Sequence, residues 1–271
     1  MKRVLTLFAA MTLVASLAHA ALAGDTLADV KKKGLLVVGV KDSLPPFGYI
    51  DEKSREIVGY DIDFVKAIAK KLGVKLELKP VTSASRMPQL MAGNIDMIAA
   101  TMSKDPQRAK QIYFSYSYFL TAQKFLTNKG KINSVQELRG KKIGTAKGST
   151  SEQNVKKAIP TATVLSFDDY PQAFLALQQG KVAAVTTDES ILAGILGKAP
   201  NKNRYEIPNL QISEEHYGLG MRKEDRNLIA FVNKTLLEME KTGQAQQIFD
   251  RWFGPASSTP LKRTFKITAD K

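Results

Sequence analysis

The stretch RMPQLMAGNIDMIAATMSKDPQR, residues 86–108, decides the fold. It opens with a short segment of helical apolar periodicity that stops at Gly93, and glycine commonly ends helices. The apolar run 95–100 then predicts a short buried strand. A helix, a buried strand and the start of a further helix thus follow one another within one short segment, which is typical of α/β proteins.

Small polar side chains connect this strand to the next helix. Thr101 and Ser103 follow the strand, and Pro106 predicts a helix start with Asp105 as its N-cap. Arg108 lies in the first turn of that helix. Hydroxyl oxygens, backbone N–H groups and a forked guanidinium would meet in one small space, and this combination suits a carboxylate. The sequence therefore predicts a binding site for a small carboxylate-bearing molecule here.

The chain contains two α/β units, and the stretch described above belongs to the first of them. The first unit consists of strand 35–40, a helix that residues 60–63 lead into and Gly73 closes, strand 75–81 and the stretch above. This order predicts a parallel sheet. The second unit lies between residues 142 and 196. Segments 124–128 and 217–221 read as strands that cross between the units. We therefore expect residues 24–123 and 219–254 to form lobe 1, residues 124–218 to form lobe 2, and residues 255–271 to form a peripheral tail.

The N-terminus predicts export. Residues 1–23 combine Lys2 and Arg3 with an apolar run and small-residue endings, the pattern of a secretory signal peptide cleaved near residues 20–23. A membrane anchor is the alternative. The chain has no cysteine, so it offers neither a disulfide nor an acceptor for a lipid. We expect a protein in the periplasm.

Charge and histidine content restrict the function classes. The net charge is +14, but the lysines are scattered, and no basic stripe carries interleaved aromatic residues. We therefore expect no nucleic-acid partner. His216 is the one histidine after the signal segment, which argues against a zinc site or a histidine-based triad. No metal or cofactor is expected.

Several segments resemble one family, the exported amino-acid-binding proteins of ABC importers in the polar-amino-acid branch. The segments occur in family order over residues 35–253 and read VGVKDSLPPFGY, VGYDIDFVKAIAKKLG, the opening stretch, KIGTAKGSTSE, ALQQGKVAAVTTDESIL and YGLGMRKED. The resemblance implies the type II periplasmic binding fold. In that fold two lobes, each a mainly parallel sheet flanked by helices, are joined by two crossing strands that act as a hinge.

The same resemblance implies the roles of individual residues. Arg108 binds the α-carboxylate of the ligand, while Thr101 and Asp188 receive its α-ammonium group. A zwitterion held in a closing cleft needs one fixed cation and one fixed anion, since otherwise buried charges stay unpaired. The alternatives are a surface arginine for Arg108 and a helix N-cap for Asp188. The expected ligand-binding residues are Lys41, Ser83, Arg86, Thr101, Ser103, Arg108, Ser149, Thr150, Tyr170 and Asp188.

The expected ligand is glutamate or aspartate. Lys41 and Arg86 stand where glutamate/aspartate-binding members carry cations, and two cations favour a second carboxylate. Two departures from that subgroup remain: a lysine replaces the first arginine, which removes bidentate geometry, and Tyr170 replaces a histidine. The alternatives are a solvated lysine for Lys41 and a structural ion pair on the hinge side for Arg86. The alternative ligand is another polar amino acid such as glutamine or asparagine.

The predicted function is capture and delivery rather than catalysis. Two lobes close on an amino acid, and the closed form docks on the membrane permease of an ABC importer. We expect a monomer. The alternatives are a dehydratase of prephenate-like acids with the same fold, which would need an additional acid or base in the cleft, and a sensor domain.

Overall fold

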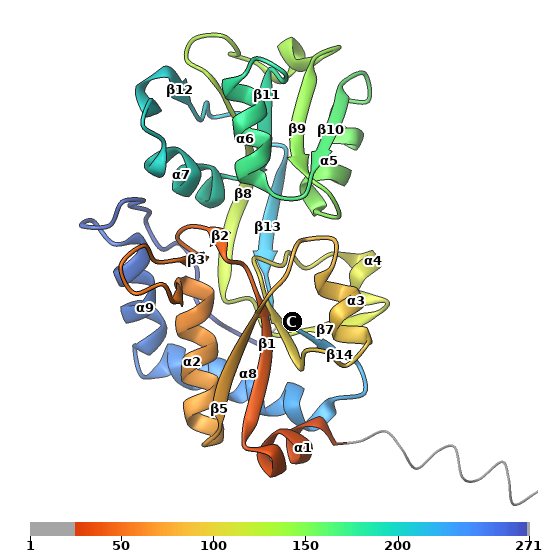
Figure 1. The fold of residues 1–271 in the computed structure, drawn as a ribbon, viewed down its shortest axis with the longest axis vertical. Coiled ribbons are helices and arrows are strands. Elements are labelled where there is room, and N and C mark those ends of the chain that lie inside the picture. The colour runs from red at the N-terminus through yellow and green to blue at the C-terminus, as the bar shows by residue number, and fades with distance from the viewer. Residues whose placement is uncertain (1–24, 270–271) are drawn as a thin grey trace, which may run out of the picture.

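The computed structural model describes residues 25–269, so the segment 1–23 that predicts a signal peptide lies outside it. Two sheets with flanking helices form two lobes, one above the other in Figure 1. Two strands, β8 (Phe119–Asn128) and β13 (Ser213–Tyr217), run between them. Among the described residues, no helix has the length and apolar character needed to cross a membrane. The predicted two-lobe α/β fold is confirmed.

The lower lobe contains a five-stranded sheet with the order β5-β1-β6-β14-β7. β1 (Leu35–Val40) pairs in parallel with β5 (Lys75–Pro80) and β6 (Met97–Ala99). β14 (Gly220–Arg222) pairs antiparallel with β6 and with β7 (Ile112–Phe114). The interior position of β1, between β5 and β6, agrees with its nearly continuous apolar sequence, LLVVGV, which suits a strand covered on both faces.

Helices and a small sheet complete the lower lobe. Helix α2 (Tyr60–Leu72) carries apolar side chains on one face and ends at Gly73, which has φ 72°. The helices are α1 (Thr26–Lys33), α2 (Tyr60–Leu72), α3 (Arg86–Met91), α4 (Pro106–Ala109), α8 (Arg226–Lys241) and α9 (Gln244–Phe253). The small sheet is formed by the segment between β1 and α2. It consists of β2 (Ser43–Leu44), β3 (Gly48–Ile50) and β4 (Ile57–Val58).

The upper lobe contains a second sheet with the order β10-β9-β11-β8-β12, and β13 pairs with β8. Its core strands are parallel, because helices connect them and return the chain to the same edge. Its remaining elements are β9 (Lys142–Ala146), β10 (Thr163–Phe167), β11 (Ala184–Asp188), β12 (Tyr205–Glu206), α5 (Thr150–Ala158), α6 (Tyr170–Gln178), α7 (Glu189–Lys198), and the 3₁₀ helices η1 (Val135–Leu138) and η2 (Lys202–Arg204).

The crossing strands have different limits from those expected. The predicted segment 124–128 is only the second half of β8, which begins at Phe119. The predicted segment 217–221 contains a break, since β13 ends at Tyr217 and β14 begins at Gly220. The reason is long-range pairing: β13 runs antiparallel to the first half of β8, with Tyr217 opposite Phe119. We propose the lobe division at residues 123/124 and 218/219, close to this crossing.

The C-terminal segment 255–269 corrects the expectation of a peripheral tail. Ile267 is only 2% exposed and Thr259 only 4%. The Phe265 ring packs edge-on against that of Phe119 at a centroid distance of 5.6 Å. A few apolar residues within a polar sequence are therefore enough to dock the segment on the lower lobe, beside the start of β8.

Candidate functional site

The predicted residues lie at the ends of strands that face the other lobe. Lys41 directly follows β1, Thr101 follows β6, Ser149 follows β9, and Asp188 ends β11. Ligands of open α/β sheets bind at the carboxyl ends of strands. Each lobe therefore turns the edge that is expected to bind a ligand toward the other lobe. Each of the ten predicted residues is at most 8% exposed. Arg108 is therefore not a surface arginine.

Direct contacts hold the two lobes together around these residues. Arg108 Nη2 donates a hydrogen bond of 3.0 Å to the Gly148 carbonyl in the upper lobe, and its Nη1 donates one of 3.1 Å to the Ser103 carbonyl. The Thr150 hydroxyl lies 3.3 Å from Ser103 Oγ, also across the interface. A Cβ at Gly148 would lie 2.9 Å from Ala84 Cα. The structure thus shows the lobes in a closed arrangement.

A second close approach lies between Gly194 on α7 and the Pro45 carbonyl in the loop after β1. A Cβ on Gly194 would come within 1.8 Å of that oxygen, so no alanine fits there when the lobes are closed. We expect Gly194→Ala to weaken ligand binding at least about tenfold, because it disfavours the closed state. Calorimetric titration measures the affinity.

Gly197→Ala is the matched control for this prediction. Gly197 lies on the same helix, and a Cβ there would meet nothing closer than 3.6 Å. The control should bind as the wild type does. Equal affinity of Gly194→Ala and the wild type would show that closure to this arrangement is not needed for binding.

Two buried cations face the site. Arg86 Nη1 donates to the Ala100 carbonyl at 2.5 Å, but Nε makes no hydrogen bond within the described chain. Lys41 Nζ also lacks a hydrogen bond there and lies 3.8 Å from Asp169 Oδ1. Burial lowers the pKa of Lys41 to about 8 and, together with the charge of Arg108, lowers the pKa of Arg86 to about 9. Both side chains are protonated at neutral pH and offer N–H donors.

Asp188 supplies the facing anion. The Tyr217 hydroxyl donates to its Oδ2, whereas Oδ1 has no hydrogen-bond partner within residues 25–269. Asp188 holds the N-cap position of α7, yet its side chain makes no capping bond. Burial and the neighbouring carboxylate of Glu215 raise its pKa to about 7. Its carboxylate is thus an acceptor directed at the site rather than at its own helix.

The remaining predicted residues have supporting contacts. Ser149 caps α5, and its Oγ accepts the Glu152 N–H at 3.1 Å. The Tyr170 hydroxyl lies 3.5 Å from Ser151 Oγ. Ser83 is buried in the loop before α3, but no hydrogen bond joins its hydroxyl to the other predicted residues in the described range. Hydrogen bonds join Arg86 to the Thr101 carbonyl and Ser103 to Arg108 and Thr150. Charge couples Lys41 and Asp188 to Arg86, and Tyr170 interacts with Ser149 and Asp188. These nine residues therefore form one polar cluster, and the structure shows Ser83 only as buried.

Three carboxylates at the site were missed by sequence reasoning. Asp169 approaches Lys41 and accepts a short hydrogen bond from Ser43 Oγ in the other lobe. Asp61 accepts the Thr101 N–H at 2.9 Å, and Glu215 Oε2 lies 3.3 Å from the Thr150 hydroxyl. Two features of the sequence could have pointed to these carboxylates. Asp169 directly precedes the predicted site residue Tyr170, and Asp61 lies in the first turn of α2.

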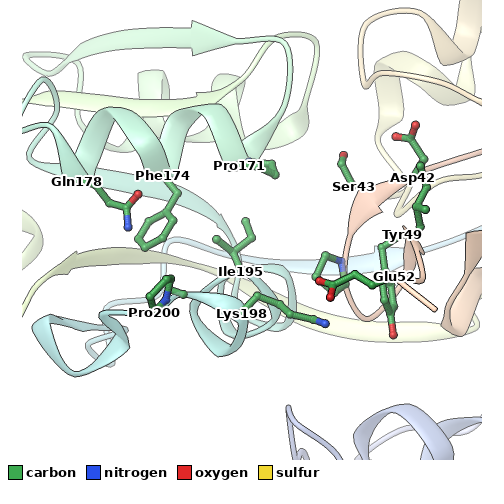
Figure 2. A pocket seen from close by; sticks show the side chains of 13 residues that line it. Asp42, Ser43, Tyr49, Glu52, Pro171, Phe174, Gln178, Ile195, Lys198 and Pro200 are labelled. Atoms are coloured by element: carbon green, nitrogen blue, oxygen red, sulfur yellow. The ribbon is translucent and has the colours of Figure 1, made fainter. Parts of the chain in front are cut away.

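Beside the buried cluster, the closed lobes form an open groove of about 410 Å³. Figure 2 shows Ser43, Tyr49 and Glu52 from the lower lobe on one side of it, and side chains of α6 and α7 on the other. None of the ten predicted residues lines this groove. It is a surface feature of the lobe interface, distinct from the buried cluster.

Two lobes closed over buried charged side chains, with polar atoms that are unsatisfied within residues 25–269, suit the capture of a small charged solute. Residues 36–255 match the family described as bacterial extracellular solute-binding proteins, family 3, and the chain belongs to this family. This confirms the resemblance seen in the sequence.

Two curated relatives and one solved structure illustrate the similarity. The chain is 40% identical to an ABC transporter glutamine-binding protein of Bacillus subtilis (strain 168), covering 84% of each chain. It is 32% identical to the glutamate/aspartate import solute-binding protein of Salmonella typhimurium, covering 99% of this chain and 94% of that protein. An ancestral arginine-binding protein bound to glutamine has a TM-score of 0.77 and 42% identity, covering 82% of this chain and 98% of that one. These relatives are named as binding proteins rather than enzymes, as predicted for this chain.

Proposed function

We propose that the protein captures a polar amino acid outside the cytoplasm, with glutamine as the preferred ligand, and delivers it to the membrane permease of an ABC importer. The names of the relatives support this proposal. The proposal includes removal of a signal peptide near residues 20–23 and a periplasmic location. The protein acts as a monomer in this proposal.

The zwitterionic part of the ligand binds between the two lobes. Arg108 pairs with the α-carboxylate, assisted by N–H groups near Ser103 and at the start of α5 beside Thr150. Thr101 and the unpaired Oδ1 of Asp188 receive the α-ammonium group. The ligand thereby pairs charges that the closed site buries, and this pairing stabilises the closed state relative to the open one.

The contact between Lys41 and Asp169 carries the proposal of glutamine. A carboxamide needs a donor for its oxygen and an acceptor for its NH₂ group, and a lysine 3.8 Å from a carboxylate offers both. A ligand carboxylate would meet Lys41 and Arg86 but also the repulsion of Asp169. The sequence-based expectation of glutamate or aspartate did not take Asp169 into account, and it stays untested.

The test is calorimetric titration of the mature protein, stripped of ligand by unfolding and refolding, against glutamine, glutamate, asparagine, aspartate and arginine. We expect glutamine to bind more tightly than glutamate. Asp169→Asn should shift the ratio of the two affinities about tenfold toward glutamate, which corresponds to about 1.4 kcal/mol, because the substitution removes a negative charge beside the ligand side chain.

Asp168→Asn is the matched control, since Asp168 is the exposed neighbour of Asp169. It should leave the ratio of the two affinities unchanged. Tighter binding of glutamate than of glutamine by the wild type would refute the proposed preference and restore the acidic ligand. No binding of any amino acid would refute the function as a whole.

A further inference from the structure

We propose that Asp61 is a positioning residue that holds Thr101 in the conformation that receives the α-ammonium group of the ligand. This proposal rests on the function proposed above, because it assigns Thr101 to the ligand. Asp61 itself makes no ligand contact in this proposal. It acts through the backbone of the residue that does.

The conformation of Thr101 is unusual and needs support. Its φ is +48°, in the left-handed region that β-branched residues seldom adopt. Its N–H donates to Asp61 Oδ2 at 2.9 Å, and its hydroxyl donates to the Ala100 carbonyl at 2.8 Å. Because the hydroxyl hydrogen is used in this way, the lone pairs of Oγ1 remain to accept an N–H from an ammonium group.

Asp61 is itself fixed from the opposite side. It is fully buried in the first turn of α2, and its Oδ1 accepts a hydrogen bond of 2.7 Å from the Tyr118 hydroxyl. The neighbouring Tyr60 hydroxyl donates to the Tyr118 carbonyl at 2.7 Å. Both carboxylate oxygens are therefore satisfied, and α2 is tied to the chain just before β8, one of the two strands that cross between the lobes.

Arg86 holds the same segment from the other direction. Its Nη1 donates to the Ala100 carbonyl at 2.5 Å, so Ala100 and Thr101 lie between a cation and an anion that are both buried. Burial raises the pKa of Asp61 to about 7, while the bonds from Tyr118 and Thr101 and the charge of Arg86 oppose this rise. An ionised Asp61 is a stronger hydrogen-bond acceptor for the Thr101 N–H than a protonated Asp61 would be.

The test compares two aspartates of the same helix turn. Asp61→Asn keeps the shape of the side chain and removes its charge. Asp63→Asn makes the same change at a carboxylate that accepts from Trp252 Nε1 at 2.8 Å on α9, away from the site. With L-glutamine and L-glutamate as probes, we expect Asp61→Asn to weaken binding about tenfold, the effect of reducing the binding-competent population to about one tenth. Asp63→Asn should leave the affinity unchanged.

A double-mutant cycle distinguishes positioning from a general structural role. In a Thr101→Ala background the hydroxyl to be positioned is absent, so Asp61→Asn should cause no further loss of affinity. The same tenfold loss in both backgrounds would overturn the proposal, because Asp61 would then act through another group. Wild-type affinity of Asp61→Asn would also overturn it.

Hydrogen exchange of the Thr101 amide provides a readout that needs no ligand. Exchange should be faster in Asp61→Asn than in the wild type and unchanged in Asp63→Asn. If the wild type bound no amino acid, the proposed function would fail, and this measurement would still decide whether Asp61 holds the Thr101 N–H. Equal exchange in the wild type and Asp61→Asn would overturn the positioning role.

Discussion

Arg108→Ala is expected to weaken the binding of every amino acid by about 3 kcal/mol or more, a factor of roughly 150. The loss should be general because the proposed partner of Arg108 is the α-carboxylate, which all amino acids share. The substitution also removes the hydrogen bonds to the carbonyls of Ser103 and Gly148, so the closed state loses one of its contacts between lobes. Calorimetry with glutamine and glutamate measures both affinities.

Two further variants sharpen this prediction. Arg108→Lys keeps the charge but loses the forked geometry, and it should recover only part of the affinity. Arg139→Ala removes an exposed arginine from the upper lobe and should bind as the wild type does. A loss confined to glutamate in Arg108→Ala would assign Arg108 to the ligand side chain and contradict its proposed contact with the α-carboxylate.

Local sequence patterns predict much of the fold because the relevant signals are local. The strand 35–40, the helix that Gly73 ends, and Asp105 as N-cap of a helix at Pro106 occur as expected. The limits of the crossing strands could not be found in this way. The first half of β8 is a strand because β13, almost a hundred residues later, pairs with it.

The site residues were predicted from the family resemblance and, for Thr101, Ser103 and Arg108, from their positions between a buried strand and the start of the next helix. Asp169 and Asp61 could not be found in this way, since their roles depend on distances between distant parts of the chain. Asp169 acquires its role when the lobes close and bring it beside Lys41. Asp61 acquires its role through the left-handed backbone of Thr101, which a sequence pattern does not show.

Asp188→Asn is expected to cost about 2–5 kcal/mol of binding free energy, the usual loss when one partner of a buried charge pair is removed. The ammonium group of the ligand would lose its anion, and Arg86 and Arg108 would remain as buried cations without it. All three side chains are buried, and the charges of both arginines act to lower the pKa of Asp188. Titration with glutamine measures the loss.

The raised pKa of Asp188 gives this prediction a dependence on pH. Burial, followed by the charge of Glu215, raises the pKa from the ordinary 3.8 to about 7 in the folded protein without ligand. Between these values the folded chain keeps a proton that the unfolded chain has lost. Ionisation of Asp188 therefore lowers the free energy of unfolding as the pH rises from about 4 to about 7, after which its contribution is constant.

Ligand binding has the opposite dependence on pH, because the α-ammonium group favours the ionised carboxylate. The affinity of the wild type should rise with pH up to about 7, by up to about tenfold for each pH unit below that value. Asp61 titrates in the same range, so Asp61→Asn is measured alongside. Calorimetry in buffers of different ionisation enthalpy counts the protons released on binding.

Asp188→Asn separates the contribution of this one carboxylate. Its affinity should be low and should rise less steeply than that of the wild type between pH 5 and pH 7, with Asp61 accounting for the rise that remains. Its proton release should be smaller than that of the wild type by up to about one proton. Without ligand it should melt at least as high as the wild type at pH 8, because the wild type then buries an ionised carboxylate with an unpaired oxygen. An affinity of the wild type that stayed constant between pH 5 and pH 7 would contradict the assignment of Asp188 to the ammonium group. In the proposed function, an ionised Asp188 destabilises the ligand-free closed protein at neutral pH, and pairing with the ammonium group of the ligand offsets this cost.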